Sequence, residues 1–330
     1  MQKSKVSLDI DLKKDGKQFG FARLPHSVHR SANGWIPIPV VSIRNGPGKT
    51  MLLMAGVHGD EYEGQIALSN LARQLTADDI EGQLIILPMA NYPAAKAGNR
   101  VSPIDNGNLA RSFPGDPLGS VTQVIAHFIE TELMSQADLV FDLHSGGSSL
   151  NYLPSTTALS VPGTESHARL QAYMETFGAP YALNFYGMAG IGTSSDAAAR
   201  NNILRIGCEM GGRGWLSQEF RETCETGVKR ILAQEGVLKG WRPTPPQATQ
   251  FLTVTKDCYV YAASDGIFEA NATLGDVVSA GSLAGLMHFP SRPLLEPEPV
   301  RFRTDGIVVC ERPLSHCETG DCLFHLAIPG

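Results

Sequence analysis

No apolar run in this 330-residue sequence approaches the ~20 residues that span a bilayer. Residues 1–16, which read MQKSKVSLDIDLKKDG, also lack the apolar core of a secretory signal peptide. We therefore expect a cytoplasmic protein that has no membrane partner.

The chain has few cysteines and a small net charge. The six cysteines are scattered and form no C-x-x-C motif, so without an export signal we expect reduced thiols rather than disulfides. The formal net charge of −6 gives no electrostatic reason to expect nucleic acid as a partner. An anionic substrate would have to be met by individual arginines.

The composition that is present is that of a large globular protein. Apolar residues make up 42% of the chain, and at about 150 residues per domain this length predicts two domains. Such a chain can bury a core that needs no crosslinks.

Apolar strand patterns alternate with helical patterns over the first ~250 residues, and this alternation is typical of a covered parallel sheet. The predicted strands lie at 51–57, 84–87, 139–143 and 203–206, and the predicted helices at 66–75, 121–133, 170–177 and 220–232. We expect an α/β fold with a mostly parallel (mixed) sheet and helices on both faces.

The pattern of apolar and polar residues changes after the proline-rich segment 242–249, which predicts an extended linker. Beyond it, short β-type runs are separated by Gly-Asp turns, which predicts a small all-β domain made of two similar halves. The expected domains are a catalytic domain at 1–244 and a β-rich domain at 245–330. The tail has no lysine at a hairpin tip to which a carrier group such as lipoyl or biotin could be attached, so a carrier role is not expected. We expect the tail to shield the active site or to pack between subunits of a homo-oligomer such as a dimer.

Chemically useful side chains follow the predicted strands. Ligands bind beyond the carboxyl ends of strands in open α/β sheets, so residues at these ends should share one rim. The residues concerned are His58, Glu61, Asn91, His144 and Glu209.

Three of these residues match a catalytic zinc site. His58 and Glu61 are three residues apart where a strand turns into a helix, and His144 supplies a third ligand from another strand. Asp142 could hold a ligand imidazole through its second nitrogen. Glu209 suits a general base that deprotonates the zinc-bound water and then protonates the leaving amine. We predict one Zn2+ per chain, although another divalent ion would fit these ligand types.

Several segments resemble the succinylglutamate desuccinylase/aspartoacylase family, whose fold belongs with the zinc carboxypeptidases. The matching segments are MAGVHGDEYEG (54–64), RVSPID (100–105), NLARSFPG (108–115), FDLHSGG (141–147), EMGG (209–212) and the tail turn LGDVVSAG (274–281). The resemblance covers most of the chain and implies a zinc-carboxypeptidase-like sheet. It also implies a small N-acyl amino acid as substrate.

The resemblance assigns roles to individual residues. It gives His58, Glu61 and His144 as zinc ligands and Glu209 as the catalytic glutamate. Arg100 resembles the arginine that stabilises the oxyanion. Arg111 resembles the arginine that clamps the substrate carboxylate. Asn108, beside Arg111, and Asn91, on the common rim, complete our predicted substrate-binding set.

One position departs from the family pattern. The family reads Asn-Leu-Asn-Arg where this chain reads Asn108-Leu109-Ala110-Arg111. The missing asparagine works beside the arginine on the carboxylate, and losing such a hydrogen bond costs about 1.5–3 kcal/mol. Altered specificity, weakened activity and a deliberate substitution all remain open explanations.

Within the family, the lead-in at 19–45 and the compact tail most resemble deacetylases of ectoine breakdown, which release acetate from Nα-acetyl-L-2,4-diaminobutyrate. The alternatives are aspartoacylase or succinylglutamate desuccinylase activity, a metallocarboxypeptidase, and a zinc-binding, non-catalytic sensor of acyl amino acids.

Two other residue groups are weaker metal candidates. His26 and His29 lie in a loop-like stretch without a third ligand. The tail holds four further candidates close together: His316, Cys317, Cys322 and His325. Because Cys322 and His325 are three residues apart on a predicted strand, their side chains should face opposite ways.

Overall fold

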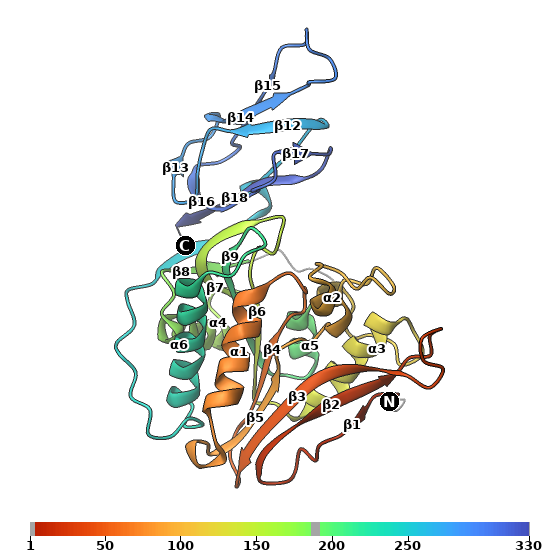
Figure 1. Cartoon of the computed structure of the whole chain (residues 1–330). Helices are drawn as coiled ribbons and strands as arrows, with labels where there is room; N and C mark the ends of the chain where they lie inside the picture. Colours follow the sequence, from red (N-terminus) through yellow and green to blue (C-terminus); the bar gives the residue numbers. More distant parts are fainter. Residues whose placement is uncertain (1–3, 186–191, 330) are drawn as a thin grey trace.

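The chain folds around one long mixed β-sheet (Figure 1), and the computed structural model describes residues 4–185 and 192–329. The middle of the sheet consists of four parallel neighbours. In order, these are β5 (Gly82–Leu87), β4 (Thr50–Ala55), β6 (Leu139–His144) and β9 (Leu204–Gly212). They are the four strands expected from the apolar runs, and β5 and β6 are buried along their whole length. Burial on both faces explains why these segments show no polar alternation.

Helices cover both faces of the sheet, as predicted (Figure 1). One face carries α1 (Tyr62–Gln74), α4 (Glu165–Phe177) and α6 (Gln218–Gln234). The other carries α2 (Tyr92–Ala97), α3 (Val121–Phe128) and α5 (Ser194–Arg200). The helical pattern expected to reach residue 133 changes pitch after Phe128, where a π turn at Ile129–Leu133 and a 3-10 turn at Met134–Gln136 follow.

The outer strands make the sheet mixed. The N-terminal strands β1 (Ser7–Leu8), β2 (Gly16–Pro25) and β3 (Trp35–Asn45) are antiparallel, and β3 pairs with the edge of β5. On the other side, β7 (Asn151–Ala158) runs antiparallel to β9, and β8 (Tyr181–Asn184) runs parallel to β7. Sequence reasoning did not assign these strands. Strands β1, β2 and β3 mix exposed with more buried positions, and β7 contains polar residues and a proline.

The described part of the tail contains strands and one 3-10 turn at Lys256–Cys258. Its strands are β10 (Gln250–Thr253), β11 (Tyr259–Tyr261), β12 (Gly266–Ala270), β13 (Val277–Val278), β14 (Leu283–His288), β15 (Glu298–Arg301), β16 (Gly306–Glu311), β17 (His316–Cys317) and β18 (Cys322–Pro329). Strands β12, β14, β15 and β17 form a separate four-stranded sheet.

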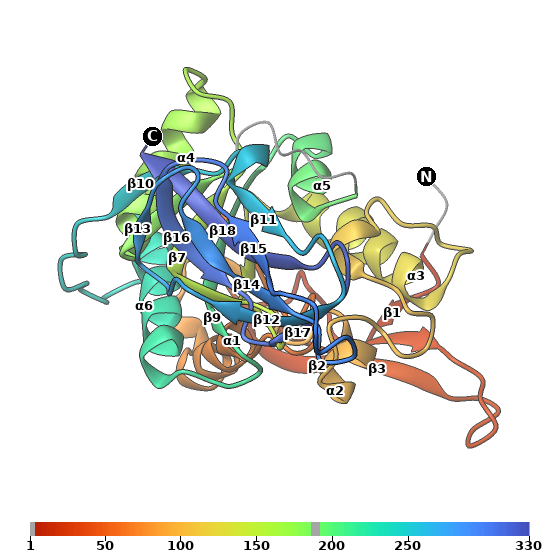
Figure 2. The ribbon, with the colours of Figure 1, turned by 90° about the horizontal axis from the view of Figure 1, so that it is seen from above.

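The large sheet continues into this tail. Strand β10 pairs with β8, and β16 pairs with β7. Figure 2 shows the tail strands lying over β7 and β9, which carry the site residues Tyr152 and Glu209 described below. A third hydrophobic core fills this junction and includes Leu183 of β8 together with Leu252, Phe324 and Leu326 of the tail.

Close backbone packing positions the loop between β4 and α1. A side chain at Gly59 would bring its Cβ to 2.1 Å from the carbonyl carbon of Ala94 in α2. Only glycine fits this approach, so the His-Gly-Asp-Glu turn is pressed against α2. Among the described helices, none is long and apolar enough to cross a membrane.

Candidate functional site

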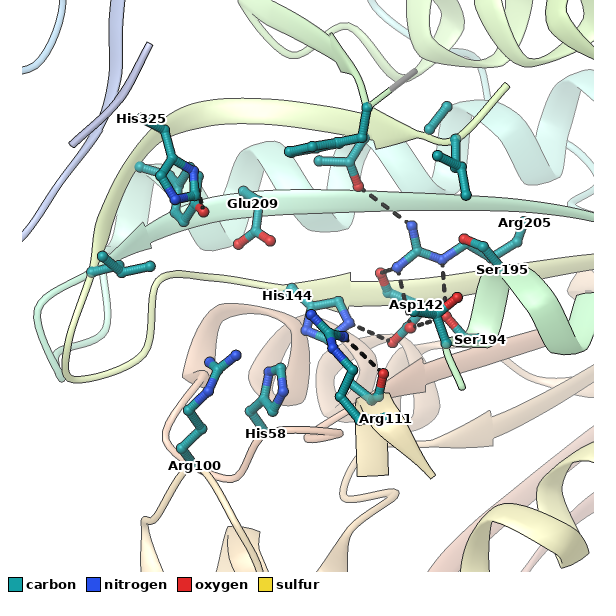
Figure 3. A pocket seen from close by; sticks show the side chains of 18 of the residues that line it. His58, Arg100, Arg111, Asp142, His144, Ser194, Ser195, Arg205, Glu209 and His325 are labelled. Atoms are coloured by element: carbon teal, nitrogen blue, oxygen red, sulfur yellow. Dashed lines mark hydrogen bonds and ion pairs between the residues drawn. The ribbon is translucent and has the colours of Figure 1, made fainter. Parts of the chain in front are cut away.

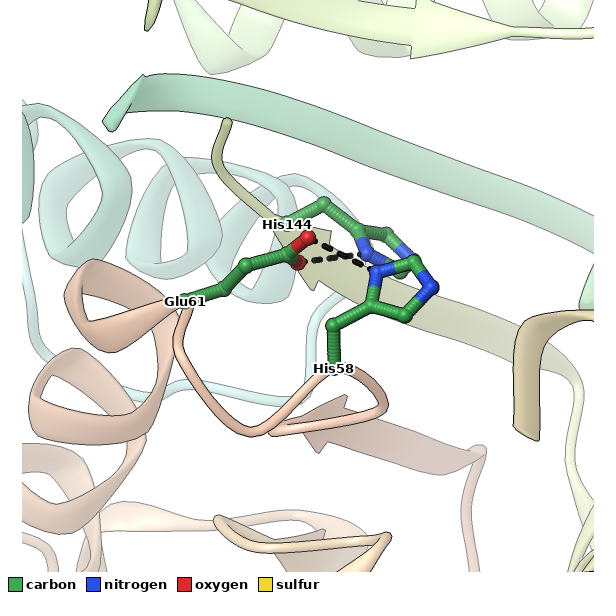
Figure 4. A group of neighbouring side chains, drawn as sticks. All are labelled: His58, Glu61 and His144. Atoms are coloured by element: carbon green, nitrogen blue, oxygen red, sulfur yellow. Dashed lines mark hydrogen bonds and ion pairs between the residues drawn. The ribbon is translucent and has the colours of Figure 1, made fainter. Parts of the chain in front are cut away.

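His58, Glu61 and His144 meet at the carboxyl ends of β4 and β6 (Figure 4). All three are buried, and each offers a ligand atom within 4.8 Å of the others. The Glu61 carboxylate lies between the two rings. Its Oε1 is 2.7 Å from Nδ1 of His58, and its Oε2 is 2.7 Å from Nδ1 of His144. Of the described residues, this is the one His/Cys/Asp/Glu group with metal-site spacing.

The second nitrogen of each ring has its own polar neighbour. Nε2 of His144 is 3.1 Å from Oδ1 of Asp142, and Nε2 of His58 is 3.2 Å from Oδ1 of Asn108. Such contacts fix ring orientation and leave the Nδ1 atoms facing a common point. The structure therefore places Asn108 against His58 rather than on the cavity wall, where we expected a substrate contact.

Asp142 is itself held by Arg205 and Ser194. Nη2 of Arg205 is 3.1 Å from Oδ2 of Asp142, and the Ser194 hydroxyl donates to the same oxygen. Burial alone would raise the pKa of Asp142, but the charges of His144 and Arg205 hold it well below its usual range. Sequence reasoning did not identify Arg205. The available signal was a charged residue inside an otherwise apolar strand.

The two glutamates of the site have opposite protonation behaviour. Burial would raise the pKa of Glu61, but His58 and His144 lower it to about 2. Glu209 pairs with His144 across β6 and β9. Burial, reinforced by the charge of Glu61, raises the pKa of Glu209 to about 8, and its buried Oε2 has no hydrogen-bond partner in the described part of the chain. A carboxyl with a pKa near neutrality suits proton transfer in both directions.

These groups open into a cavity of about 400 Å³ (Figure 3). Its lining residues include His58, Arg100, Ala110, Arg111, Asp142, His144, Tyr152, Thr157, Ser194, Ser195, Arg205, Glu209, Tyr259 and His325. The cavity thus brings together residues from the main sheet and, through Tyr259 and His325, residues from the tail.

The two predicted arginines differ in their partners. Nη1 of Arg100 lies 3.5 Å from Oε1 of Glu61. The guanidinium of Arg111 donates to the carbonyl of Ala110 at 2.8 Å and forms no ion pair within the described residues. Arg111 is therefore the cation available to an incoming carboxylate.

Asn91 is not among the residues that line the cavity. Its side chain is fully buried, does not line the cavity, and neither of its amide atoms has a partner in the described structure. The reason is strand order, because Asn91 follows β5, which is separated from the strand bearing Glu209 by β4 and β6.

The tail candidates do not form a metal site. His325 lines the cavity, and its Nδ1 is 3.0 Å from the hydroxyl of Tyr152. Cys317 is buried, and its thiol contacts the backbone carbonyls of Leu314 and Ser315.

Comparison with known proteins gives the family. Residues 47–234 match the succinylglutamate desuccinylase/aspartoacylase catalytic domain. The chain belongs to this family.

Relatives cover almost the whole chain. The N-alpha-acetyl-L-2,4-diaminobutyric acid deacetylase of Halomonas elongata is 36% identical, over 98% of this chain and 95% of that protein. The product-bound ectoine utilization protein EutE (DoeB) of Ruegeria pomeroyi has a TM-score of 0.95 and 38% identity, over 99% of this chain and 100% of that one. A succinylglutamate desuccinylase/aspartoacylase from Rhodobacter sphaeroides has a TM-score of 0.92 and 36% identity, with coverage of 99% and 100%.

Ala110 is the residue that departs from the family pattern beside Arg111. Its side chain is buried, lines the cavity and directly precedes Arg111. The position where we expect the family to supply a second carboxylate-binding group is therefore a methyl group on the cavity wall.

His325 predicts a measurable acid sensitivity. Burial lowers the pKa of His325 to about 3. Below about pH 6.5, the imidazole is therefore protonated in the unfolded chain but stays neutral in the folded chain. The stability associated with neutral His325 is present above pH 6.5 and is lost as the pH falls toward 3. Urea unfolding at pH 7.5 and 5.0 should show the wild type losing about 2 kcal/mol more than His325→Asn, at about 1.4 kcal/mol per pH unit. Equal losses would contradict a buried neutral imidazole.

Proposed function

We propose that this chain is a zinc-dependent amidohydrolase that deacylates a small N-acyl amino acid, with Nα-acetyl-L-2,4-diaminobutyrate as substrate. The observation that carries the proposal is the combination, at one cavity, of a two-histidine, one-carboxylate cluster, a glutamate with a raised pKa and an arginine that has no acidic partner among the described residues. The activity printed for the Halomonas elongata relative and the product-bound EutE structure support the substrate.

The donor set fits zinc. Two imidazole nitrogens and one carboxylate make an established catalytic ligand set that leaves a position open. Asp142 and Asn108 would keep the other ring nitrogens occupied, so that both Nδ1 atoms stay available. When bound, zinc supplies a Lewis acid that polarises the amide carbonyl and lowers the pKa of water.

The chain's own residues would bind the substrate and move the proton. Arg111 binds the free carboxylate of the amino acid, and Arg100 offers positive charge where the carbonyl oxygen becomes negative. Glu209 takes a proton from the attacking water and returns it to the leaving nitrogen. The C–O bond forms first, as the carbonyl oxygen becomes negative, and the C–N bond then breaks as the nitrogen takes up the proton from Glu209, giving acetate and a free amine.

The amino-acid end of the cavity also suits a substrate amine. Asp142, Ser194, Ser195 and Arg111, all labelled in Figure 3, line the cavity. The Ser195 hydroxyl can accept a hydrogen bond from the side-chain ammonium of 2,4-diaminobutyrate, and Asp142, although engaged with His144, Arg205 and Ser194, adds negative charge there. The small cavity and the tail residues in its wall disfavour a peptide substrate.

Three assignments about the architecture belong to the same proposal. We infer that the sheet is of the zinc-carboxypeptidase type, that the chain divides into functional units at 1–244 and 245–330, and that the tail serves as a wall of the active site. The contributions of Tyr259 and His325 to the cavity support the last of these. Assembly into a homodimer is a prediction that size measurement in solution would test.

Acetate release tests the proposed reaction. The zinc-loaded protein should hydrolyse Nα-acetyl-L-2,4-diaminobutyrate, and His58→Ala should lower kcat/KM by about a thousandfold or more, since the site would lose a ligand. His29→Ala is the matched control, because His29 is exposed and outside the cavity, and it should retain full activity. Turnover of N-acetylaspartate or N-succinylglutamate alone would refute the substrate, and no turnover of any acyl amino acid would refute the reaction.

Restoring the family residue at position 110 tests the carboxylate clamp. Ala110→Asn adds a hydrogen-bonding group beside Arg111, so we expect KM to fall about tenfold, in line with about 1.5 kcal/mol for a hydrogen bond to a charged group. Steady-state kinetics on the acetylated substrate and on its carboxamide would separate the effects. An equal change for both compounds would show that Ala110 does not lie beside the carboxylate.

A further inference from the structure

One wall of the cavity comes from the tail and has no part in the proposed reaction. It consists of Tyr259 on β11 and His325 on β18, together with Tyr152 on β7, and we call these three residues the acyl wall. His325 was singled out in the sequence as a weak metal candidate, yet its side chain belongs to this wall.

Strand pairing fixes the acyl wall in place. Cys310 of β16 pairs with Tyr152 on one side and with His325 on the other, while Tyr259 pairs directly with His325. The hydroxyl of Tyr152 lies 3.0 Å from Nδ1 of His325, and the rings of Tyr259 and His325 have centroids 4.1 Å apart. Side chains held by four paired strands and by one another make a rigid boundary.

The acyl wall is polar but carries no charge at neutral pH. Burial lowers the pKa of His325 to about 3 and raises the pKa values of Tyr152 and Tyr259 above their usual range. No ion pair reaches these three side chains among the described residues. A carboxylate placed against them would be desolvated without a counter-charge, which is costly.

The positions of the other groups show which part of a substrate the wall would meet. The amide must lie near Glu209 and His144, and Arg111 would take the carboxylate of the amino acid. In Figure 3, Glu209 is drawn between His325 and Arg111, whose side chain overlaps that of His144 in this view. A substrate anchored at Arg111 therefore extends its acyl group toward His325.

We propose that the acyl wall of Tyr152, Tyr259 and His325 sets the length and charge of the acyl group, so that the site accepts acetyl and rejects longer or carboxylate-bearing groups such as succinyl. This inference rests on the proposed function. Arg100, another cation that lines the cavity, already lies 3.5 Å from Glu61 and is assigned to the carbonyl oxygen.

A matched series of substrates tests the proposal. The series keeps L-2,4-diaminobutyrate and varies the Nα-acyl group between acetyl, butyryl and succinyl. The zinc-loaded wild type should prefer acetyl by about a hundredfold, since methylenes without space cost about 1–3 kcal/mol each. In His325→Ala the butyryl-to-acetyl ratio of kcat/KM should rise at least about tenfold, because the lost ring leaves room. Tyr152→Phe removes only the hydroxyl that contacts Nδ1 of His325, so the butyryl-to-acetyl ratio should rise by less.

His316→Ala is the matched control, because His316 is an exposed histidine of the same tail and does not line the cavity. It should leave all ratios unchanged. A purely structural role for His325 would lower kcat/KM for every acyl group alike, and that result would overturn the proposal. A change in preference among amino acids, with the acyl preference intact, would also overturn it, because the wall would then face the other half of the substrate.

Product binding keeps the test informative if the variants turn over slowly. Calorimetry with acetate, butyrate and succinate on the zinc-loaded proteins should show the same shift in preference toward butyrate in His325→Ala. An unchanged order of affinities would refute the acyl wall. Failure of the wild type to hydrolyse any member of the series refutes the proposed function itself, whereas wild-type turnover with unaltered variant ratios refutes only this inference.

Discussion

The rest of the site depends on one buried carboxylate. Glu61 is almost fully enclosed and ionised, and its two oxygens lie between the imidazoles of His58 and His144. A buried charge needs partners, and these two rings are the partners that the turn after β4 and the end of β6 provide. Asp142 and Asn108 then fix the outer ring nitrogens. The parallel pairing of β4 with β6 is what makes this arrangement possible.

The same cavity holds a second glutamate with opposite behaviour. Flanking imidazoles lower the pKa of Glu61 to about 2, whereas burial without a partner raises that of Glu209 to about 8. Carboxyl groups whose pKa values are driven apart by their surroundings typically divide the work, one staying charged while the other transfers protons. The tail adds the neutral aromatic side chains of Tyr259 and His325 to the cavity wall, which we propose limit the size and charge of the acyl group.

The residues that could be predicted from the sequence are those that stand at the carboxyl ends of its apolar strand segments. His58, Glu61, His144 and Glu209 come together because they end adjacent parallel strands, a relation visible in the apolar runs. Asn91 also follows a parallel strand, but its side chain is buried and does not line the cavity. The outer strands, Arg205 and the acyl wall required the structure. Their positions depend on long-range pairing of β7, β16 and β18, for which no local pattern exists.

Zinc titration of metal-free protein tests the central claim most directly. Calorimetry with elemental analysis should give one tightly bound zinc per chain in the wild type. Glu61→Gln should weaken binding at least about a hundredfold, because it removes the charged ligand between the two histidines. Equal affinity and stoichiometry in the wild type and in Glu61→Gln would contradict the account, since the metal would then bind elsewhere. Absence of zinc binding in the wild type would contradict it as well.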